Sequence, residues 1–192
     1  MTARRTTALA LSLLLTGCSF FSRTKSRIYS LERIPPAAPV TAVRGVPIGI
    51  DSLEIPPGFD RSDVVVRLPN HQLDVRGIEQ WSASLAPLVR HTLASDLAAR
   101  LPEAMVILPG QAIPPGPMRA IDVAFEELAA GPENAVVLDA QWVVREEGRP
   151  TVRRHERITV DLRSLDSAEV AAGLSRALAT FADRIAAQLG PG

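Results

Sequence analysis

Three long segments near the carboxyl terminus alternate apolar and polar side chains, and they constrain the fold more than any other feature. The segments are residues 118–128, 135–145 and 151–162. A period of two places successive side chains on opposite faces of a strand. In the third segment one face is polar and the other is apolar: Arg153, His155, Arg157, Thr159 and Asp161 against Ile158, Val160 and Leu162. With a turn at residues 146–149, the pattern predicts an antiparallel meander that packs one face and exposes the other to water.

Two other segments have a helical period. The first, residues 84–101, repeats an apolar side chain every four residues: Leu85, Val89, Leu93, Leu97 and Leu101. The second begins with Asp166 or Ser167 as its N-cap and stops at Gly190-Pro191. Its apolar stripe is Val170, Leu174, Leu178, Phe181, Ile185 and Leu189. One-sided stripes of this kind are typical of helices that pack on a sheet.

Shorter apolar runs between proline- and glycine-rich turns predict five more strands: 27–32, 46–53, 63–68, 72–76 and 105–108. The predicted order is four strands, a helix, four strands and a helix. This order favours an α+β fold in two layers, with a mostly antiparallel sheet packed by two amphipathic helices. We expect residues 27–192 to form one such domain, because a chain of this length buries enough surface to be stable alone.

The amino terminus has the pattern of a bacterial lipoprotein signal. Arg4 and Arg5 precede an apolar run over residues 6–15, and Thr16-Gly17 leads directly to Cys18, the chain's only cysteine. The run is too short to cross roughly 30 Å of hydrocarbon. We interpret residues 1–17 as a signal peptide, Cys18 as the lipidation site and residues 18–26 as a lipidated tether. The alternatives are an ordinary secretory signal with an incidental cysteine, or a buried free thiol.

Lipidation at Cys18 would hold the domain permanently at a membrane. Each buried methylene of the attached chains contributes about 0.8 kcal/mol, and several chains together make the anchor stable. Ser19 follows the cysteine. An aspartate at that position suggests retention in the inner membrane, so Ser19 favours the outer membrane. We therefore expect the protein to be lipid-anchored on the periplasmic face of the outer membrane.

The charge balance argues against a nucleic-acid partner. The full chain has 21 basic and 21 acidic residues, and two of the basic ones, Arg4 and Arg5, leave with the signal. A slightly acidic chain lacks the basic field that nucleic acids require. The cations in residues 23–27 either touch lipid headgroups or belong to a solvated tether.

No residue pattern predicts catalysis, a cofactor or a metal ion. His71, His91 and His155 lie far apart in the sequence, without the short spacing of zinc ligands. Neither a nucleophile elbow nor a phosphate-binding glycine loop occurs. The adjacent pairs Glu126-Glu127 and Glu146-Glu147 are expected to point to opposite faces and to act as edge and turn charges. We therefore do not expect an enzyme.

Several soft motifs occur in an order that resembles one family. They are Ile28-Tyr29-Ser30-Leu31 and the block of residues 55–67 with Asp60-Arg61, which leads into Trp81, Leu85 and the first helix. Together with Cys18, they resemble the ABC-type transport auxiliary lipoproteins, including the PqiC-like group. In that family Tyr29 and Leu31 match an early strand and Asp60-Arg61 opens the next one. We interpret Asp60-Arg61 as a turn with a local ion pair.

The resemblance implies an accessory role in lipid transport across the envelope. Similar proteins accompany an inner-membrane ABC permease and its ATPase, together with an MCE-domain protein that bridges the periplasm. The lipoprotein would dock that bridge at the outer membrane, and a homo-oligomer is a further expectation. In this interpretation the partners are the membrane, through the anchor, and the proteins of the transport system.

Two other functions remain open at this point. The domain itself would hold a lipid or amphiphile if an apolar cavity were lined by Trp142, Phe125, Phe181 or Leu174. An envelope hydrolase would need a polar cleft where a nucleophile, a base and an orienting group converge.

Overall fold

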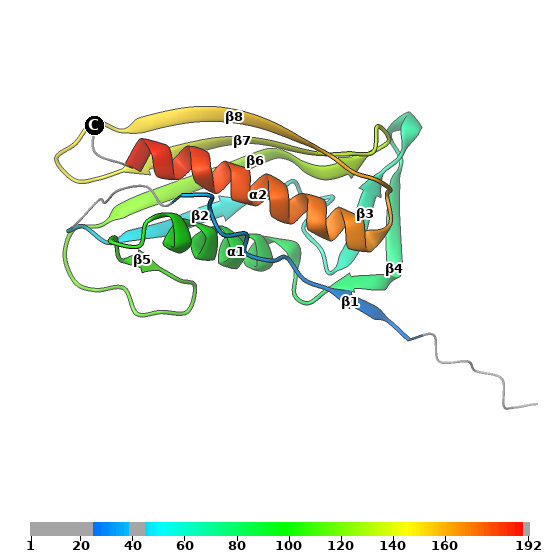
Figure 1. The fold of residues 1–192 in the computed structure, drawn as a ribbon, viewed down its shortest axis with the longest axis horizontal. Coiled ribbons are helices and arrows are strands. Elements are labelled where there is room, and N and C mark those ends of the chain that lie inside the picture. The colour runs from blue at the N-terminus through cyan, green and yellow to red at the C-terminus, as the bar shows by residue number, and fades with distance from the viewer. Residues whose placement is uncertain (1–24, 39–44, 190–192) are drawn as a thin grey trace, which may run out of the picture.

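The computed structural model describes residues 25–38 and 45–189, and within these ranges the elements follow the predicted order (Figure 1). Four strands precede the first α-helix, and four more precede the second. The elements are β1 (Arg27–Tyr29), β2 (Ile48–Glu54), β3 (Asp63–Arg67), the short 3-10 helix η1 (Pro69–His71), β4 (Leu73–Trp81), α1 (Leu85–Arg100), β5 (Val106–Ile107), β6 (Arg119–Gly131), β7 (Ala135–Arg145), β8 (Val152–Asp161) and α2 (Ser167–Leu189).

The last three strands form the predicted antiparallel meander. β6 pairs with β7 from Ala120↔Arg145 to Gly131↔Ala135. β7 then pairs with β8 along nearly its whole length. The side chains of β7 that point to the helices are apolar, whereas those on the other face include Asp139 and Gln141, so the alternation in the sequence is confirmed.

The other edge of β6 is shared by two strands, which divides the sheet into two wings. β2 runs parallel to the first half of β6 and also pairs with β5. β3 reaches β6 at the single register pair Val66↔Ala130 and continues the sheet through β4 to β1. The eight-stranded sheet is therefore mixed, although its long pairings are antiparallel, and the expected fold class is confirmed.

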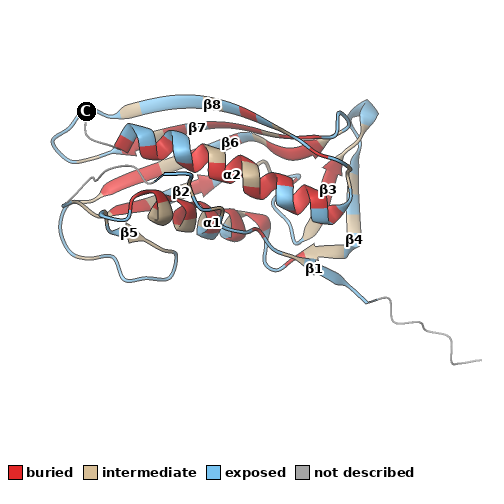
Figure 2. Cartoon of the chain, in the orientation of Figure 1, coloured by how far each residue is buried: buried red, intermediate tan, exposed pale blue. Residues whose placement is uncertain are grey.

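Both helices lie on the same face of the sheet and make a second layer (Figure 1). Their apolar stripes are buried between the layers, while the outer sides of the helices are exposed (Figure 2). Leu93 of α1 and Ile185 of α2 are fully buried. The rings of Phe125 and Phe181 meet at a centroid distance of 5.9 Å and join β6 to α2. This contact is typical of a close-packed aromatic pair.

The two helices begin differently. Asp166 caps α2, because its Oδ1 accepts a hydrogen bond of 2.9 Å from the N–H of Glu169. Ser84 at the start of α1 makes no such side-chain bond. Instead, Asp60 Oδ1 accepts the N–H of Ala86 at 2.9 Å. A loop that is distant in the sequence therefore supplies the cap of α1.

β4 extends five residues beyond the end predicted at residue 76, and Trp81 closes this strand. The Trp81 N–H donates to the carbonyl oxygen of Ser62 at 2.7 Å, and its backbone lies beside Tyr29 in the parallel pairing with β1. These partners on both sides keep the chain extended up to Trp81. The indole is buried in the core, so the expected helix-leading tryptophan has a packing role.

The expectation that Glu126 and Glu127 point to opposite faces is wrong. The register of β6 against β7 shifts between Phe125 and Glu127, so Glu126 is an extra residue in a β-bulge. Glu126 accepts a hydrogen bond from Gln141, and Glu127 accepts one from Arg67. Both carboxylates therefore lie on the face of the sheet away from the helices, in the interior of the sheet and not at its edge.

Candidate functional site

Cys18, the predicted lipidation site, lies outside the described residues. The structure does describe the chain from Lys25 onward, and it shows how this segment is fixed to the domain. β1 pairs in parallel with the end of β4. The N–H of Ser82 donates to the Tyr29 carbonyl at 2.7 Å, and the Tyr29 hydroxyl lies 3.5 Å from Glu79 Oε1. The segment that would follow the tether is thus an edge strand of the sheet.

The residues after β1 are held by both helices, in an arrangement we call the N-terminal clasp. Asp96 Oδ1 accepts the N–H of Ile34 at 3.0 Å, and Arg100 Nη1 donates to the Ile34 carbonyl at 3.1 Å. On the other side, Ser175 Oγ accepts the N–H of Glu32 at 3.0 Å. Residues 32–34 are therefore bound to α1 through two side chains and to α2 through one.

The clasp contains a buried ion pair. The Arg100 side chain is only 2% exposed and Asp96 is 0% exposed, and the two approach at 3.4 Å. Arg100 Nε also lies 2.6 Å from Asp183 Oδ1 on α2. Burial raises the pKa of Asp96 to about 6, although the Ile34 N–H and the Arg100 charge act in the opposite direction. Asp96 Oδ2 has no hydrogen-bond partner in the described part of the chain.

A second group of charges lies on the sheet face away from the helices. We call Arg67, Glu127, Asp139, His155 and Arg157 the open-face cluster. The Asp139 carboxylate is bound on both oxygens: Oδ1 lies 2.5 Å from His155 Nε2, and Oδ2 accepts a hydrogen bond of 2.5 Å from Arg157 Nη1. Arg67 Nη1 lies 2.8 Å from Glu127 Oε1. Burial works against ionisation of Asp139, but the hydrogen bonds from His155 and Arg157 hold its pKa below the ordinary value.

The open-face cluster brings together part of what a hydrolase would need. The Asp139 carboxylate contacts the His155 imidazole in the way that a carboxylate positions a histidine base in a hydrolase. Among the described residues, however, no serine, threonine or cysteine side chain is hydrogen-bonded to His155. The nucleophile that the hydrolase alternative would require therefore has no counterpart at this imidazole in the described part of the chain.

Glu126, Asp139 and His155 each present one possible ligand atom within 4.8 Å of the other two. Sequence reasoning missed this grouping, because the bulge that brings in Glu126 has no signature in the sequence. Each of the three already has a protein partner, since Gln141 Nε2 binds Glu126 at 2.6 Å and Asp139 binds His155. Hydrogen bonds between protein side chains thus explain why Glu126, Asp139 and His155 lie together.

The remaining residues selected from the sequence have structural positions. His71 and His91 are both exposed, and among the described residues neither belongs to the group of possible metal ligands that contains His155. Arg61 Nε pairs with Asp63 at 3.4 Å, so the local ion pair at Asp60-Arg61 forms with the following aspartate, while Asp60 caps α1. Glu146 binds Arg119 at 2.6 Å in the turn after β7.

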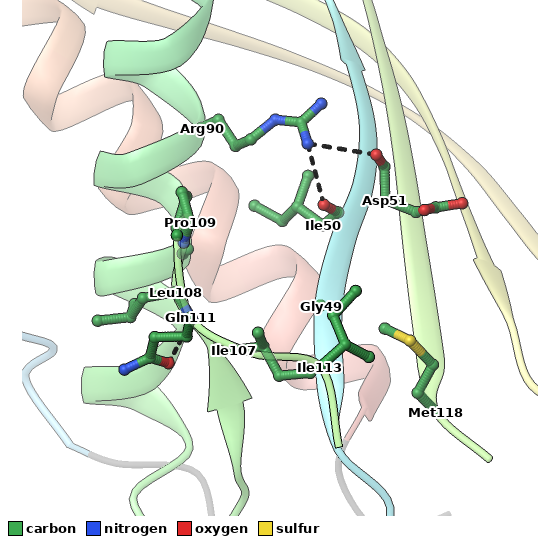
Figure 3. A pocket seen from close by; sticks show the side chains of 12 residues that line it. Gly49, Ile50, Asp51, Arg90, Ile107, Leu108, Pro109, Gln111, Ile113 and Met118 are labelled. Atoms are coloured by element: carbon green, nitrogen blue, oxygen red, sulfur yellow. Dashed lines mark hydrogen bonds between the residues drawn. The ribbon is translucent and has the colours of Figure 1, made fainter. Parts of the chain in front are cut away.

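The four residues that would have to line an apolar cavity, if the domain itself held a lipid there, are packed in the core. Trp142, Phe125, Phe181 and Leu174 are all buried. A pocket does open elsewhere, between α1, β2 and the loop after β5 (Figure 3). Its lining includes none of these four residues. Within residues 25–38 and 45–189, no helix is long and apolar enough to span a membrane.

Two solved structures have similar folds. A crystal structure of an uncharacterized protein aligns with a TM-score of 0.73 at 17% sequence identity, covering 86% of this chain and 99% of that one. A crystal structure of a protein from Xanthomonas campestris aligns with a TM-score of 0.64 at 14% identity, covering 84% and 94% of the two chains. At these identities the likeness concerns the fold alone. No curated protein matches the chain in sequence.

A match to a family model identifies the protein family, which similarity of fold alone does not. The model of the family described as the ABC-type transport auxiliary lipoprotein component matches residues 29–186. This range runs from the end of β1 almost to the end of α2 and includes both helices and all the strands of the sheet that follow β1. The resemblance seen in the sequence is thereby confirmed, and the chain belongs to the family of ABC-type transport auxiliary lipoprotein components.

Proposed function

We propose that this protein is the lipid-anchored accessory subunit of an MCE-associated lipid transport system of the ABC type. Cys18 carries the lipid and holds the domain on the periplasmic face of the outer membrane. The domain docks the periplasm-spanning MCE-domain protein there, and the inner-membrane permease and ATPase supply the energy. The observation that supports this proposal is the family match over residues 29–186, joined in the sequence to a lipobox that ends at Cys18.

The tether between the anchor and the described part of the chain is short. At about 3.3–3.6 Å per residue, the chain from Cys18 to Lys25 reaches at most roughly 25 Å. The N-terminal clasp then ties the following residues to both helices. An anchored domain of this kind stays close to the membrane, and this closeness raises its effective concentration for a partner that spans the periplasm.

Changing the lipobox tests the anchor. Cys18→Ala should abolish lipidation and release the protein from the membrane fraction, as measured by acyl-chain labelling and fractionation. Ser19→Asp is the matched control: it leaves the cysteine intact, so lipidation should persist while the protein moves to the inner membrane. Retention of Cys18→Ala in the outer membrane would show that the proposed anchor is wrong.

Affinity capture tests the partner. Purification of the native lipoprotein from solubilised membranes should recover an MCE-domain protein, and the released Cys18→Ala variant should recover less of it. A capture from a strain that lacks the MCE-domain protein is the control. If the native lipoprotein repeatedly recovers no MCE-domain protein, the docking function fails, while the fold and the family assignment remain.

A further inference from the structure

We propose that the pocket between α1, β2 and the loop after β5 binds the end of a single acyl chain whose anionic headgroup pairs with Arg90. The pocket has a volume of about 240 Å³. Its lining is mainly apolar and includes Ile50, Ala94, Ile107, Leu108, Ile113 and Met118. Sites for drug-sized ligands enclose roughly 300–1,000 Å³. The smaller volume suits part of one hydrocarbon chain and is too small for a two-chain phospholipid.

Side-chain packing and turn hydrogen bonds fix the walls of the pocket. Gly49 lets the Met118 side chain lie against β2, because a Cβ at position 49 would come within 2.9 Å of Met118 Cε. The opposite wall is a closed turn, in which the N–H of Gln111 donates to the Leu108 carbonyl and Gln111 Oε1 accepts the N–H of Leu108. Gly110 has a φ of +87° in this turn, a conformation that favours glycine.

Arg90 contributes a positive charge to the lining of the pocket. Its Nη1 donates to the carbonyl oxygens of Ile50 at 3.3 Å and Asp51 at 3.2 Å, and these bonds hold the guanidinium against β2 within the lining (Figure 3). Within the described residues, Arg90 forms no ion pair. The nearby carboxylate of Asp51 points away and lies 2.7 Å from Arg145 Nη2. The positive charge of Arg90 therefore has no acidic partner there.

An apolar pocket beside an unpaired guanidinium is complementary to an amphiphile with an anionic head. The remaining guanidinium donors fit a carboxylate or a phosphate in the two-pronged geometry that arginine favours. The chain end gains binding energy from burial against the aliphatic lining. Binding in this pocket would need neither the lipid at Cys18 nor the docking of an MCE-domain protein, because every residue involved lies between positions 49 and 118.

Photolabelling of the full-length lipoprotein in its native membranes tests the proposal. The probe is dodecanoic acid with a diazirine near its methyl end, and mass spectrometry locates the labelled residues. We expect labelling of residues 107–118 and of α1 near Ala94. Dodecanoate should displace the probe at least tenfold better than dodecanol, and each methylene added between octanoate and dodecanoate should strengthen displacement by up to about fourfold.

Two competitors distinguish the sources of the headgroup. Dodecanoate presents a carboxylate, and a lysophosphatidic acid with the same chain presents a phosphate. Better displacement by either one supports the site and identifies the head that it prefers. The Cys18→Ala variant should keep its pocket labelling whether or not it leaves the membrane, so failure of the anchor and failure of the pocket are separate results.

Substitutions at the pocket complete the test. Arg90→Gln should weaken displacement by dodecanoate at least tenfold and leave dodecanol unchanged, and Arg90→Lys should restore part of the difference. Ile113→Ser should weaken both competitors about threefold or more, and it should fold normally because Ile113 is 67% exposed. Arg153→Gln and Ile28→Ser are matched controls, since both residues are exposed and lie outside the pocket.

The proposal is overturned if labelling is confined to residues near Lys25, or if dodecanol and dodecanoate displace the probe equally. It is also overturned if neither Arg90→Gln nor Ile113→Ser changes displacement while circular dichroism shows that both variants are folded.

Discussion

The Asp60 carboxylate accepts the backbone N–H of Ala86 at 2.9 Å and so closes the first turn of α1 from a loop 26 residues upstream. The first N–H groups of a helix have no partner within the helix, and a carboxylate there also interacts favourably with the helix dipole. The interaction therefore fixes the proline-containing loop to the helix.

Replacing Asp60 should show how much this cap contributes to the free energy of unfolding. We expect Asp60→Ala to lower the free energy of unfolding by about 1 kcal/mol, because one helix N–H loses its acceptor. Urea denaturation gives the value. Asp60→Asn keeps an acceptor oxygen and should lose less. Arg61→Ala removes only an exposed ion pair and should change stability by less than about 0.5 kcal/mol. Equal losses for Asp60→Ala and Arg61→Ala would contradict the capping role.

The N-terminal clasp should depend strongly on Arg100. Arg100→Ala removes the charge beside Asp96 and the donor to the Ile34 carbonyl. Removing one partner of a buried pair costs about 3–5 kcal/mol, because the other partner is left buried and uncompensated. Asp183→Ala is the control: that carboxylate is 54% exposed, so its loss should be small. Denaturant unfolding and amide exchange at Ile34 would report both effects, and an unchanged exchange rate in Arg100→Ala would argue against the clasp.

Asp96 should make stability fall as the pH rises from about 4 to 6. Its pKa in the folded protein, about 6, exceeds the ordinary value of 3.8, so the folded state binds the proton more tightly than the unfolded state does. The stabilisation is complete below about pH 4 and is lost as the pH approaches 6, by roughly 3 kcal/mol. Asp96→Asn removes this titration. The stability of the variant relative to wild type should therefore increase across this range, as measured by urea unfolding at several pH values.

Comparing the two proteins isolates the Asp96 contribution. Other carboxylates, such as Asp122 and Glu169, have pKa values lowered by hydrogen bonds from Arg145 and Arg163 respectively, and they act in the opposite direction. Their contributions are common to both proteins and cancel in the difference. A difference that stays constant between pH 4 and 6 would show that Asp96 has an ordinary pKa.

Gly173 should resist substitution although it lies inside α2. An alanine normally stabilises a helix by up to about 1 kcal/mol relative to glycine. Here a Cβ would overlap Leu162 Cδ2 and lie 3.0 Å from Val136 Cγ2. Overpacking of a core costs about 1–3 kcal/mol, so we expect Gly173→Ala to be neutral or destabilising by up to about 2 kcal/mol in thermal or urea unfolding. Ala172→Gly, on the exposed side of α2, calibrates the intrinsic helix preference. A clear gain in stability for Gly173→Ala would disprove the close contact.

The elements that the sequence predicted well are those whose own periodicity determines them. The stripes through Leu93 and Phe181 and the alternation along β7 each depend on residues within one segment, so they could be recognised without knowing their neighbours. The antiparallel order of β6, β7 and β8 followed from short connections. The parallel pairing of β2 with β6 could not be predicted, because more than sixty residues separate the partners and no local pattern specifies which strand edge they share.

The polar features were predicted least well, because their meaning depends on what packs over them. Asp96 and Arg100 have the spacing of an ordinary surface pair on a helix. They are buried where residues 32–34 cross over α1 and where α2 contributes Asp183 beside Arg100. Glu126 and Glu127 were assigned to opposite faces from a strict period of two, and a one-residue bulge reversed that assignment. Arg90 and the pocket gave no signal in the sequence, since the lining comes from four separate segments.

The parallel pairing of β1 with β4 has a mechanical consequence. A force applied to the chain at Lys25 along the strand axis loads the β1–β4 strand pair in shear. The hydrogen bonds between the two strands then carry the force together and do not open one after another. Any force that overcomes them next meets the bonds of residues 32–34 to two different helices. The amino-terminal segment would therefore transmit an external pulling force to the sheet through β1 and to the helix layer through residues 32–34.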